Sequence, residues 1–413
     1  MTGKQNAPEI RFEGFTDPWE QRKLGELCTI SKGHGYSKAD IRDAGTPLIL
    51  YGRLYTQYES RIENVDTFAV EQEGSLLSKG NEVIVPASGE TAEDIADASS
   101  VRRSGIIFGG DLNVVTPVSK LDPDYIALAI TYSKAHDDLA KRAQGKSVVH
   151  VHGNDIAEVE IPYPSESEQK LISTVVLGLD SLITLHQRKH DKLCTVKKSM
   201  LDKMFPKPGE TEPEIRFEGF TDPWEQRKLG SIAASFDYGL NAAATEYDGQ
   251  NKYLRITDID DATHEFLKSD LTTPLADLAM SADYLLEEGD LLFARTGASV
   301  GKTYLYRQYD GTVYFAGFLI RARIGESADP EFVYQATLTD AYKKYVAITS
   351  QRSGQPGVNA QEYADYQLML PSRTEQQQIG MTLRSLDNLI TLHQRKLELL
   401  RNIKKSLLDR MFV

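Results

Sequence analysis

Apolar residues recur every seven positions in two stretches of the chain, with steps that alternate between three and four residues. This spacing predicts two long helices that pack on each other as a coiled coil. Polar layers that fix the register are expected at His186 and Lys189 and at the matching His393 and Lys396. The alternative is an amphipathic helix packed on a core. The first series is Ile172, Val175, Leu179, Leu182, His186, Lys189, Leu193, Val196 and Met200, and the second is Ile379, Thr382, Leu386, Leu389, His393, Lys396, Leu400, Ile403 and Leu407.

Both predicted helices carry the same start signal. Ser165 with Glu168, and Ser372 with Glu375, have the spacing of a capping box, and each pair directly follows a proline. A helix of about 40 residues is roughly 60 Å long, which corresponds to about 17 base pairs of B-DNA. We therefore expect each helix to act as a spacer.

The chain is a tandem duplication. The string PEIRFEGFTDPWEQRKLG at residues 8–25 recurs unchanged at 213–230, and LITLHQRK at 182–189 recurs at 389–396. The halves diverge between these shared pieces. Each half therefore consists of a shared N-terminal segment, here called the strap (8–25 and 213–230), a divergent domain and a shared helix. The predicted domains are an N-terminal domain at 1–163, a spacer helix at 164–206, a linker and second domain at 207–370, and a second spacer helix at 371–413.

The divergent domains mix β-rich runs with helices. Strands are predicted within residues 47–55, 81–87, 290–297 and 312–324, and helices within 122–143 and 329–345. The two helical stretches start at matching Asp-Pro pairs, Asp122-Pro123 and Asp329-Pro330. We predict an α/β (α+β) fold with mixed sheets in each domain.

Composition narrows the classes of function. The chain has 413 residues, 40% hydrophobic content and a net charge of −13, and no stretch fits a signal peptide or a membrane span, so a cytoplasmic protein is expected. Cys28 and Cys194 lie too far apart in the sequence to suggest a disulfide framework or a zinc site. The acidic balance counts against nucleic-acid binding by the chain as a whole, although not by every face of it.

No motif in the sequence supports catalysis. In FARTGASVGKT, at 293–303, three residues instead of four separate Gly297 from Gly301, and a strand-like run follows Lys302, so the segment does not fit a P-loop. His150 and His152 lack further ligands at metal-binding spacing, and solvent or DNA contact is the favoured interpretation. We therefore predict no catalytic residue and no metal site.

Several of these segments occur together in one known family. They are the strap ending in DPWEQRKLG, the segments AQGKSVVHVHGNDIAEVEIPYPSESEQ and SGQPGVNAQEYADYQLMLPSRTEQ that lead into the helices, and the LITLHQRK repeats. The chain closely resembles the DNA-sequence-specificity subunit of type I restriction-modification enzymes over nearly its whole length after residue 8.

This resemblance implies two target recognition domains, each reading one half of a bipartite, asymmetric site on double-stranded DNA. It implies that an antiparallel helix pair separates them and that two modification subunits, which bind S-adenosylmethionine, methylate adenines. Restriction subunits that use ATP and Mg can join the complex. The chain itself would then be non-catalytic and carry no cofactor, and partner chains would supply many of the phosphate contacts.

Loop residues supply the candidate DNA contacts. Arg53, Arg255, Arg295 and Arg352 can take guanine N7/O6, and Gln144, Gln351, Gln355 and Asn359 can take adenine N6/N7. For each of them a phosphate contact or a structural role is an equal alternative. The predicted set is Arg53, Tyr55, Ser88, Glu90, Thr91, Gln144, Lys146 and His150 in the first domain, and Arg255, Arg295, Thr296, Ser299, Lys302, Gln351, Arg352, Gln355 and Asn359 in the second.

Two other functions stay open at this point. The first is a coiled-coil scaffold or adaptor without DNA specificity, which the net charge would also allow. The second is an NTPase that uses Lys302. Salt-dependent DNA binding distinguishes the recognition subunit from the scaffold, and nucleotide binding tests the NTPase.

Overall fold

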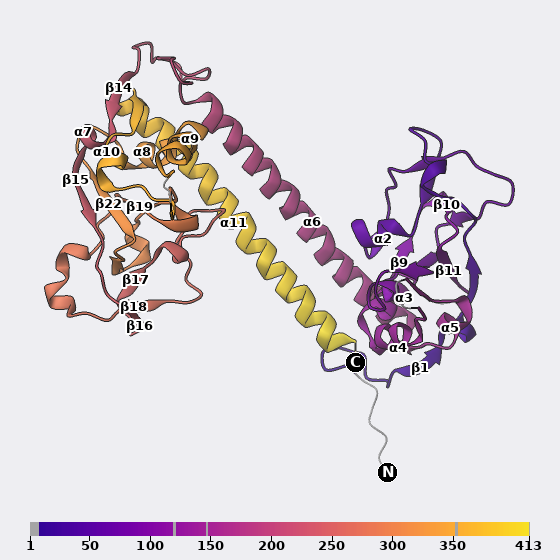
Figure 1. Cartoon of the computed structure of the whole chain (residues 1–413). Helices are drawn as coiled ribbons and strands as arrows, with labels where there is room; N and C mark the ends of the chain where they lie inside the picture. The colour runs from indigo at the N-terminus through magenta and orange to yellow at the C-terminus, as the bar shows by residue number, and fades with distance from the viewer. Residues whose placement is uncertain (1–7, 119–120, 146–147, 352–353, 413) are drawn as a thin grey trace. The chain divides into compact units, whose positions relative to one another are not determined.

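The computed structural model describes residues 8–118, 121–145, 148–351 and 354–412. It divides into two compact units: unit 1 comprises Met1–Leu185 and Lys396–Val413, and unit 2 comprises His186–Arg395. The two long helices, α6 (Glu166–Lys203) and α11 (Arg373–Met411), are labelled in Figure 1 and contribute to both units. Each unit therefore contains one divergent domain and a part of each long helix.

Unit 1 is built on two mixed sheets. The five-stranded sheet has the order β2-β11-β7-β9-β4 and the four-stranded sheet the order β5-β3-β10-β6, with β4/β9 and β10/β3 as parallel pairs. The strands are β2 (Cys28–Lys32), β3 (Thr46–Ile49), β4 (Arg61–Ile62), β5 (Phe68–Ala69), β6 (Leu77–Lys79), β7 (Glu82–Pro86), β9 (Ser99–Val101), β10 (Ser104–Phe108) and β11 (Leu112–Pro117).

Short helices accompany these sheets in the described part of unit 1. They are α1 (Leu24–Leu27), α2 (Gly52–Thr56), α3 (Pro123–Tyr132), α4 (Lys134–Arg142) and α5 (Gly153–Ala157). Of these, α3 packs against β7 and β9, and Figure 1 shows it beside β9. Almost every residue of α3 is buried, so this helix forms the centre of the unit 1 core.

Unit 2 repeats this plan with a smaller main sheet of order β15-β22-β19-β20. Its strands are β15 (Ala233–Tyr238), β16 (Ala244–Glu246), β17 (Lys252–Leu254), β18 (Thr272–Pro274), β19 (Asp290–Ala294), β20 (Thr303–Leu305), β21 (Val313–Phe315) and β22 (Leu319–Ile324). Its short helices are α7 (Leu229–Ile232), α8 (Pro330–Ala336), α9 (Asp340–Thr349) and α10 (Ala360–Ala364). The α/β fold is thus confirmed in both units. The main sheet of unit 2 is antiparallel throughout, and its parallel pair, β17 and β21, forms a separate two-stranded sheet.

The duplicated strap forms the same two-stranded ribbon in each unit. In unit 1, β1 (Glu20–Lys23) pairs antiparallel with β13 (Glu160–Tyr163), and in unit 2, β14 (Glu225–Lys228) pairs antiparallel with β23 (Gln367–Leu370). Because β13 and β23 lead directly into the long helices, each ribbon ties the start of a half to the start of its helix.

A buried ion pair fastens the strap to the helix. Arg11 donates to both carboxylate oxygens of Glu168, at 2.7 and 2.9 Å, and Arg216 donates to both of Glu375, at 2.8 Å each. The two glutamates are almost fully buried. The predicted capping boxes are therefore incomplete: the backbone N–H groups of Glu168 and Glu375 do bond the preceding serines, but their carboxylates are held by the strap arginines.

The end of the opposite long helix completes each unit. In unit 1, the backbone of Ile10 bonds Arg410 on α11, and Phe412 packs 5.9 Å from the ring of Tyr125. In unit 2, the backbone of Ile215 bonds Lys203 on α6, and Phe205 packs against Trp224 and Phe332. The core of the first domain thus includes Phe412, which comes long after it in the sequence, and the core of the second domain includes Phe205, which comes before it.

The long helices pair antiparallel within each unit, through matching contacts. Lys404 and Asp180 form an ion pair at 2.6 Å in unit 1, and Lys197 forms one with Asp387 in unit 2. These residues are related by the sequence repeat, so the two ion pairs are equivalent.

A histidine layer lies between the two ion pairs along each helix. His186 and His393 meet with their Nδ1 atoms 2.8 Å apart, so two equivalent positions of the repeat contact each other. This is the polar layer that the sequence pattern predicted.

The predicted seam is wrong at six positions. Leu182, Val196, Leu389 and Ile403 are 38–45% exposed, and Lys189 and Lys396 are exposed as well. The positions one residue later are half-buried or buried instead, and they are Ile183, His190, Lys197, Ile390, Leu397 and Lys404.

The first turns of the helices explain the shift. Val176 is buried in the unit 1 core and Leu383 in the unit 2 core, so the seam steps four residues from Ile172 and from Ile379, where the pattern had stepped three. The remaining predicted seam residues are buried or half-buried, namely Ile172, Val175, Leu179, His186, Leu193, Met200, Ile379, Thr382, Leu386, His393, Leu400 and Leu407.

Most predicted elements of the divergent domains are present. β7, β19, α3 and α8 lie where the pattern placed them, and Asp122 and Asp329 cap α3 and α8 through their side chains. Residues 47–55 are the exception, because only the first part is strand and α2 follows. Residues 312–324 form two strands separated by a turn at Gly317.

Candidate nucleic-acid interface

Two loops meet beside the main sheet of unit 1. The short strand β8 (Ser88–Gly89) follows β7 and pairs antiparallel with β12 (Val149–His150), which precedes α5. The backbone of Gln144 exchanges two hydrogen bonds with His150, at 3.0 and 2.8 Å. Segments more than 50 residues apart in sequence are therefore locked together at one edge of the domain.

Four of the predicted DNA-contacting residues gather at this junction. Ser88 Oγ and His150 Nδ1 are 3.0 Å apart, and the Tyr55 hydroxyl donates to the carbonyl of Ser88 at 2.7 Å. Burial raises the pKa of the Tyr55 phenol, so the group stays a neutral donor. His150 and Gln144 are exposed, which leaves their side chains accessible to a ligand.

Glu90 and Thr91 follow β8 on the exposed surface. Thr91 closes a small turn, because its hydroxyl donates to Asp94 at 2.7 Å and accepts from the backbone of Asp94. Glu90 would repel a phosphate, so a DNA role for it requires contact with a base donor such as cytosine N4.

Unit 2 brings the equivalent loops together. Thr296, just after β19, forms a β-bridge with Gly357, and the backbone of Gly297 donates to Pro356 at 3.0 Å. Gly297 has a φ of 71°, a left-handed conformation that favours glycine. The side chain of Gln355 lies against this glycine, since a Cβ there would come within 2.9 Å of its Nε2.

The predicted residues Arg295, Thr296, Ser299 and Gln355 therefore share this surface of unit 2, in half-exposed or exposed positions. Gln351 is exposed in the same loop as Gln355. Lys146 and Arg352 lie outside the described residues. Nothing in the geometry tests DNA contact directly, so all of these assignments stay predictions.

Other predicted side chains are engaged within the fold. Arg53 donates to Asp66, Glu59 and the carbonyl of Asn64, each at 2.9 Å, and Arg255 forms a bidentate pair with Asp258 at 2.8 Å. These contacts hold loop conformations and leave fewer donors for a base.

Lys302 and Asn359 are also occupied. Lys302 pairs with Asp261 and bonds the carbonyl of Ile259, and Asn359 caps α10 by accepting from the backbone of Glu362 at 2.9 Å. Lys302 is followed by the strand β20, as the sequence indicated, so the helix that a P-loop requires is missing at this place.

Sequence reasoning missed two aromatic residues at this surface. Tyr238 and Phe318 are 44% and 57% exposed, and both rings lie next to the guanidinium of Arg295. Phe318 falls inside an apolar run that reads as one strand. Only Gly317, which interrupts that run, signals that a turn exposes the ring.

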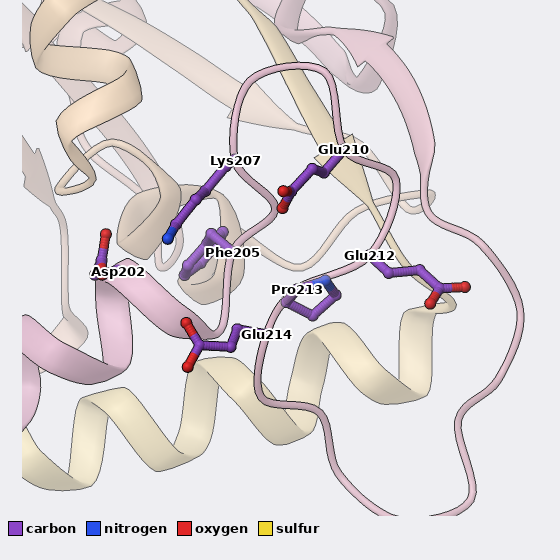
Figure 2. A pocket seen from close by; sticks show the side chains of 7 residues that line it. All are labelled: Asp202, Phe205, Lys207, Glu210, Glu212, Pro213 and Glu214. Atoms are coloured by element: carbon purple, nitrogen blue, oxygen red, sulfur yellow. The ribbon is translucent and has the colours of Figure 1, made fainter.

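Figure 2 shows a hollow between the end of α6 and the linker that follows it. It is lined by Asp202, Phe205, Lys207, Glu210, Glu212, Pro213 and Glu214. Four carboxylates against one lysine give this hollow the wrong charge for a phosphate backbone. The candidate interface is therefore placed at the loop junctions and not here.

Two kinds of feature are missing from the described part of the chain. No cluster of three or more His, Cys, Asp or Glu suited to a metal ion occurs among these residues. Likewise, none of the helices formed by them is long and apolar enough to cross a membrane.

Known proteins share this organisation. A specificity subunit of the type I restriction enzyme MjaVIII from Methanocaldococcus jannaschii is 20% identical over 424 residues, covering 98% of this chain and 95% of its own. A putative MjaX specificity subunit from the same organism is 21% identical and covers 55% of this chain and 56% of its own. The crystal structure of a type I restriction-modification S subunit from M. genitalium superposes with a TM-score of 0.64 at 16% identity, covering 98% of this chain and 99% of that one.

The family model for the type I restriction modification DNA specificity domain matches twice, at residues 16–194 and 221–402. The two matches cover most of both halves of the duplication. The chain therefore belongs to the type I restriction modification DNA specificity family and carries two of its domains in tandem.

Proposed function

We propose that each unit reads one half of a bipartite, asymmetric DNA sequence through its pair of joined loops. The observation that carries this proposal is that the same loop junction recurs in both units with different side chains. Unit 1 presents Ser88 and His150, and unit 2 presents Arg295 and Gln355. Unlike side chains on equivalent loops select unlike bases, because each base pair offers a distinct pattern of donors and acceptors in the major groove.

The long helices set the spacing between the half-sites in this proposal. α6 has 38 residues and α11 has 39, so each is roughly 57 Å long at 1.5 Å per residue. The equivalent ion pairs of Lys404 and Lys197 hold the register of the helix pair within each unit. A fixed register gives a fixed distance, which suits a gap of constant length between two recognised sequences.

Two modification subunits are the partners we propose. Each unit exposes one copy of an apolar helix surface: Leu182 and Leu185 are 45% and 47% exposed in unit 1, and Leu389 and Leu392 are 43% and 45% exposed in unit 2. Exposed leucines in matching places favour two copies of one partner, since each copy would meet the same surface.

Catalysis is assigned to those partners. They would bind S-adenosylmethionine and methylate an adenine after it leaves the base stack, and restriction subunits would use ATP and Mg. This chain would then hold no cofactor and perform no chemistry. Because its substrate would be chromosomal or invading DNA, we infer that it works in the cytoplasm.

A matched pair of insertions tests the role of the helices. Seven residues added after Leu182 and seven added after Leu389 keep the heptad phase and both Lys–Asp ion pairs. Seven helical residues add about 10 Å, or about three base pairs. Methylated-base sequencing of cells that carry the variant should show both half-sites unchanged and a gap about three base pairs longer.

The single insertion after Leu182 serves as the control, because it disrupts the helix pairing and should abolish methylation. An unchanged gap in the double insertion would show that the helices do not set the distance.

A band-shift experiment separates the recognition subunit from a scaffold or adaptor. The full chain with its modification partner is titrated onto specific and scrambled duplexes at about 50 and 200 mM salt. Binding that prefers one duplex and weakens with salt supports DNA recognition. Equal or absent binding to both duplexes would leave only the scaffold.

A further inference from the structure

Arg295 differs from the other described arginines of the unit 2 domain in having aromatic neighbours in place of acidic ones. Its guanidinium carbon lies 5.1 Å from the ring centre of Tyr238 and 5.9 Å from that of Phe318. Within the described residues, no carboxylate forms an ion pair with it. By contrast, carboxylates form ion pairs with Arg255, Arg307, Arg321 and Arg323 in the same domain.

The backbone of Arg295 is fixed on both sides. Its N–H donates to the carbonyl of Phe318 at 3.0 Å, and its carbonyl accepts from Val358 at 2.9 Å. Arg295 directly follows β19, and its backbone is bonded both to the residue before β22 and to the loop before α10. The direction of its Cα–Cβ bond is therefore fixed. Tyr238 is held as well, because its hydroxyl accepts from the backbone of Ala360 at 3.2 Å.

The two rings also restrict the side chain itself. Cation–π contact with a guanidinium favours a position over the ring face, and it leaves the terminal N–H groups free for another acceptor. Arg295 Nε is buried without a hydrogen-bond partner, whereas the residue as a whole is half-exposed. The donors available to a ligand are therefore those at the outer end of the guanidinium.

The surroundings favour a base over a phosphate. The neighbouring residues at this surface, Thr296, Gly297, Gln355 and Pro356, are uncharged, and the exposed ring of Phe318 lies beside the cation. A phosphate is strongly hydrated and is usually met by several cations, whereas a base edge offers acceptors next to apolar groups such as the thymine methyl.

We propose that Arg295 reads a guanine in the half-site of unit 2 through its N7 and O6 atoms, and that Tyr238 and Phe318 are the positioning residues that hold the guanidinium for this contact. The proposal rests on the function proposed above and selects one arginine from the four that the sequence allowed. Two parallel N–H donors at the end of a guanidinium match the two acceptors on the major-groove edge of guanine.

The test uses the full chain in complex with its modification partner. Once methylated-base sequencing has defined the target, each guanine of the unit 2 half-site is replaced singly by 7-deazaguanine, which lacks the N7 acceptor. We expect wild-type binding to fall about tenfold at one guanine. Arg295→Ala should bind the unmodified duplex at least tenfold more weakly and should lose sensitivity at that guanine alone.

Arg295→Lys distinguishes base reading from a phosphate contact. Lysine keeps the charge but lacks the planar pair of donors. If Arg295→Lys, like Arg295→Ala, does not distinguish guanine from 7-deazaguanine at the same position, the proposal is supported. Full recovery of affinity together with wild-type sensitivity to 7-deazaguanine would assign Arg295 to a phosphate and overturn it.

Variants of the aromatic residues test positioning. Phe318→Ala should reduce discrimination at that guanine with little change in thermal stability, and Phe318→Tyr should restore it. Tyr309 is 67% exposed in the same unit and makes a separate cation–π contact with Lys268, so Tyr309→Ala is the matched control and should change nothing. If Phe318→Ala lowers only stability, the ring is structural and its positioning role is rejected.

Failure of the inference can be told apart from failure of the proposed function. If the complex binds no sequence preferentially, the proposed function fails. If it binds specifically but the unit 2 half-site contains no guanine, or Arg295→Ala keeps every sensitivity of the wild type, only the assignment of Arg295 fails.

Discussion

Units 1 and 2 share one framework, formed by the strap and the long helices and here called the frame, and they differ in the loops that we propose for recognition. The frame contacts are nearly identical: Arg11 holds Glu168 in unit 1, as Arg216 holds Glu375 in unit 2. The loop junctions differ, because the side chains of Ser88 and His150 bond each other in unit 1, whereas unit 2 presents the cation of Arg295. Frame residues contact other repeated segments, so a change in one copy disturbs a buried partner. Loop residues face outward and are free to differ.

The largest effect should come from breaking the buried ion pair of either frame. Removing one partner of such a pair leaves an uncompensated buried charge, and we expect Glu168→Ala and Glu375→Ala each to lower the free energy of unfolding by about 3 kcal/mol. Glu168 also accepts from Trp19 Nε1 at 3.2 Å, whereas Trp224 Nε1 has no such partner. The loss should therefore be about 1 kcal/mol greater for Glu168→Ala.

Urea titration of the full chain measures both values. Glu158→Ala, which removes an exposed ion pair with Lys23, is the matched control and should leave stability close to that of the wild type. Equal losses for Glu168→Ala and Glu375→Ala would show that the extra tryptophan bond contributes nothing.

A smaller effect should come from the ion pairs between the long helices. Asp180 and Asp387 are both 28% exposed, and their lysine partners Lys404 and Lys197 are both 15% exposed. Equal surroundings predict that Asp180→Ala and Asp387→Ala lose similar ion-pair energies, of about 1 kcal/mol each. Each aspartate also accepts one bond from a buried side chain of its own domain, Asp180 from Ser60 Oγ at 3.1 Å and Asp387 from Gln335 Nε2 at 2.8 Å, so the total losses should stay similar.

Thermal unfolding of the two variants at low and high salt makes this comparison. High salt should reduce the difference in unfolding temperature between each variant and the wild type, since part of the lost stability is electrostatic. A marked loss in one variant alone would contradict the equivalence of the two helix contacts.

The two thiols give the mildest comparison. Burial raises the pKa of Cys28 in unit 1 to about 12, and burial also raises the pKa of the partly exposed Cys194 in unit 2. The thiolate is the reactive form, so at pH 8 a disulfide reagent should label Cys194 first and Cys28 only when unit 1 opens. Labelling rates of Cys28→Ser and Cys194→Ser, followed by mass, check this order. Rapid labelling of Cys194→Ser in buffer would show that Cys28 is not packed as described.

The repeat itself made much of the fold predictable. The duplicated strings locate the straps and the long helices, and Asp122 and Asp329 mark the starts of α3 and α8 because an aspartate before proline is a strong cap. The seam of the helices was harder to predict. Val175 and Val176 satisfy the spacing equally well, and only the packing of the first turn into the domain core selects Val176.

The site was predictable as a set of loops but not as individual contacts. Sequence patterns placed Ser88, His150, Arg295 and Gln355 on loops after strands, and these loops do meet. The sequence patterns did not indicate that Arg53 forms ion pairs with Glu59 and Asp66, because only the folding of the loop brings these acids next to it. Whether an arginine has free N–H donors depends on the residues that surround it in the folded structure, and this cannot be read from the order of residues in the sequence.

The packing of Phe412 against Tyr125 has a consequence for biosynthesis. A ribosome releases the first domain early, but Met411 and Phe412, which belong to its core, are the last described residues to be made. The core of the second domain includes Met204 and Phe205, which precede it, and Ile379 and Leu383 in the first turns of α11, so it is complete before Met411 and Phe412 are made. The domain that is translated first is therefore the last to mature, and a nascent chain truncated before α11 would expose the apolar surface that these residues cover.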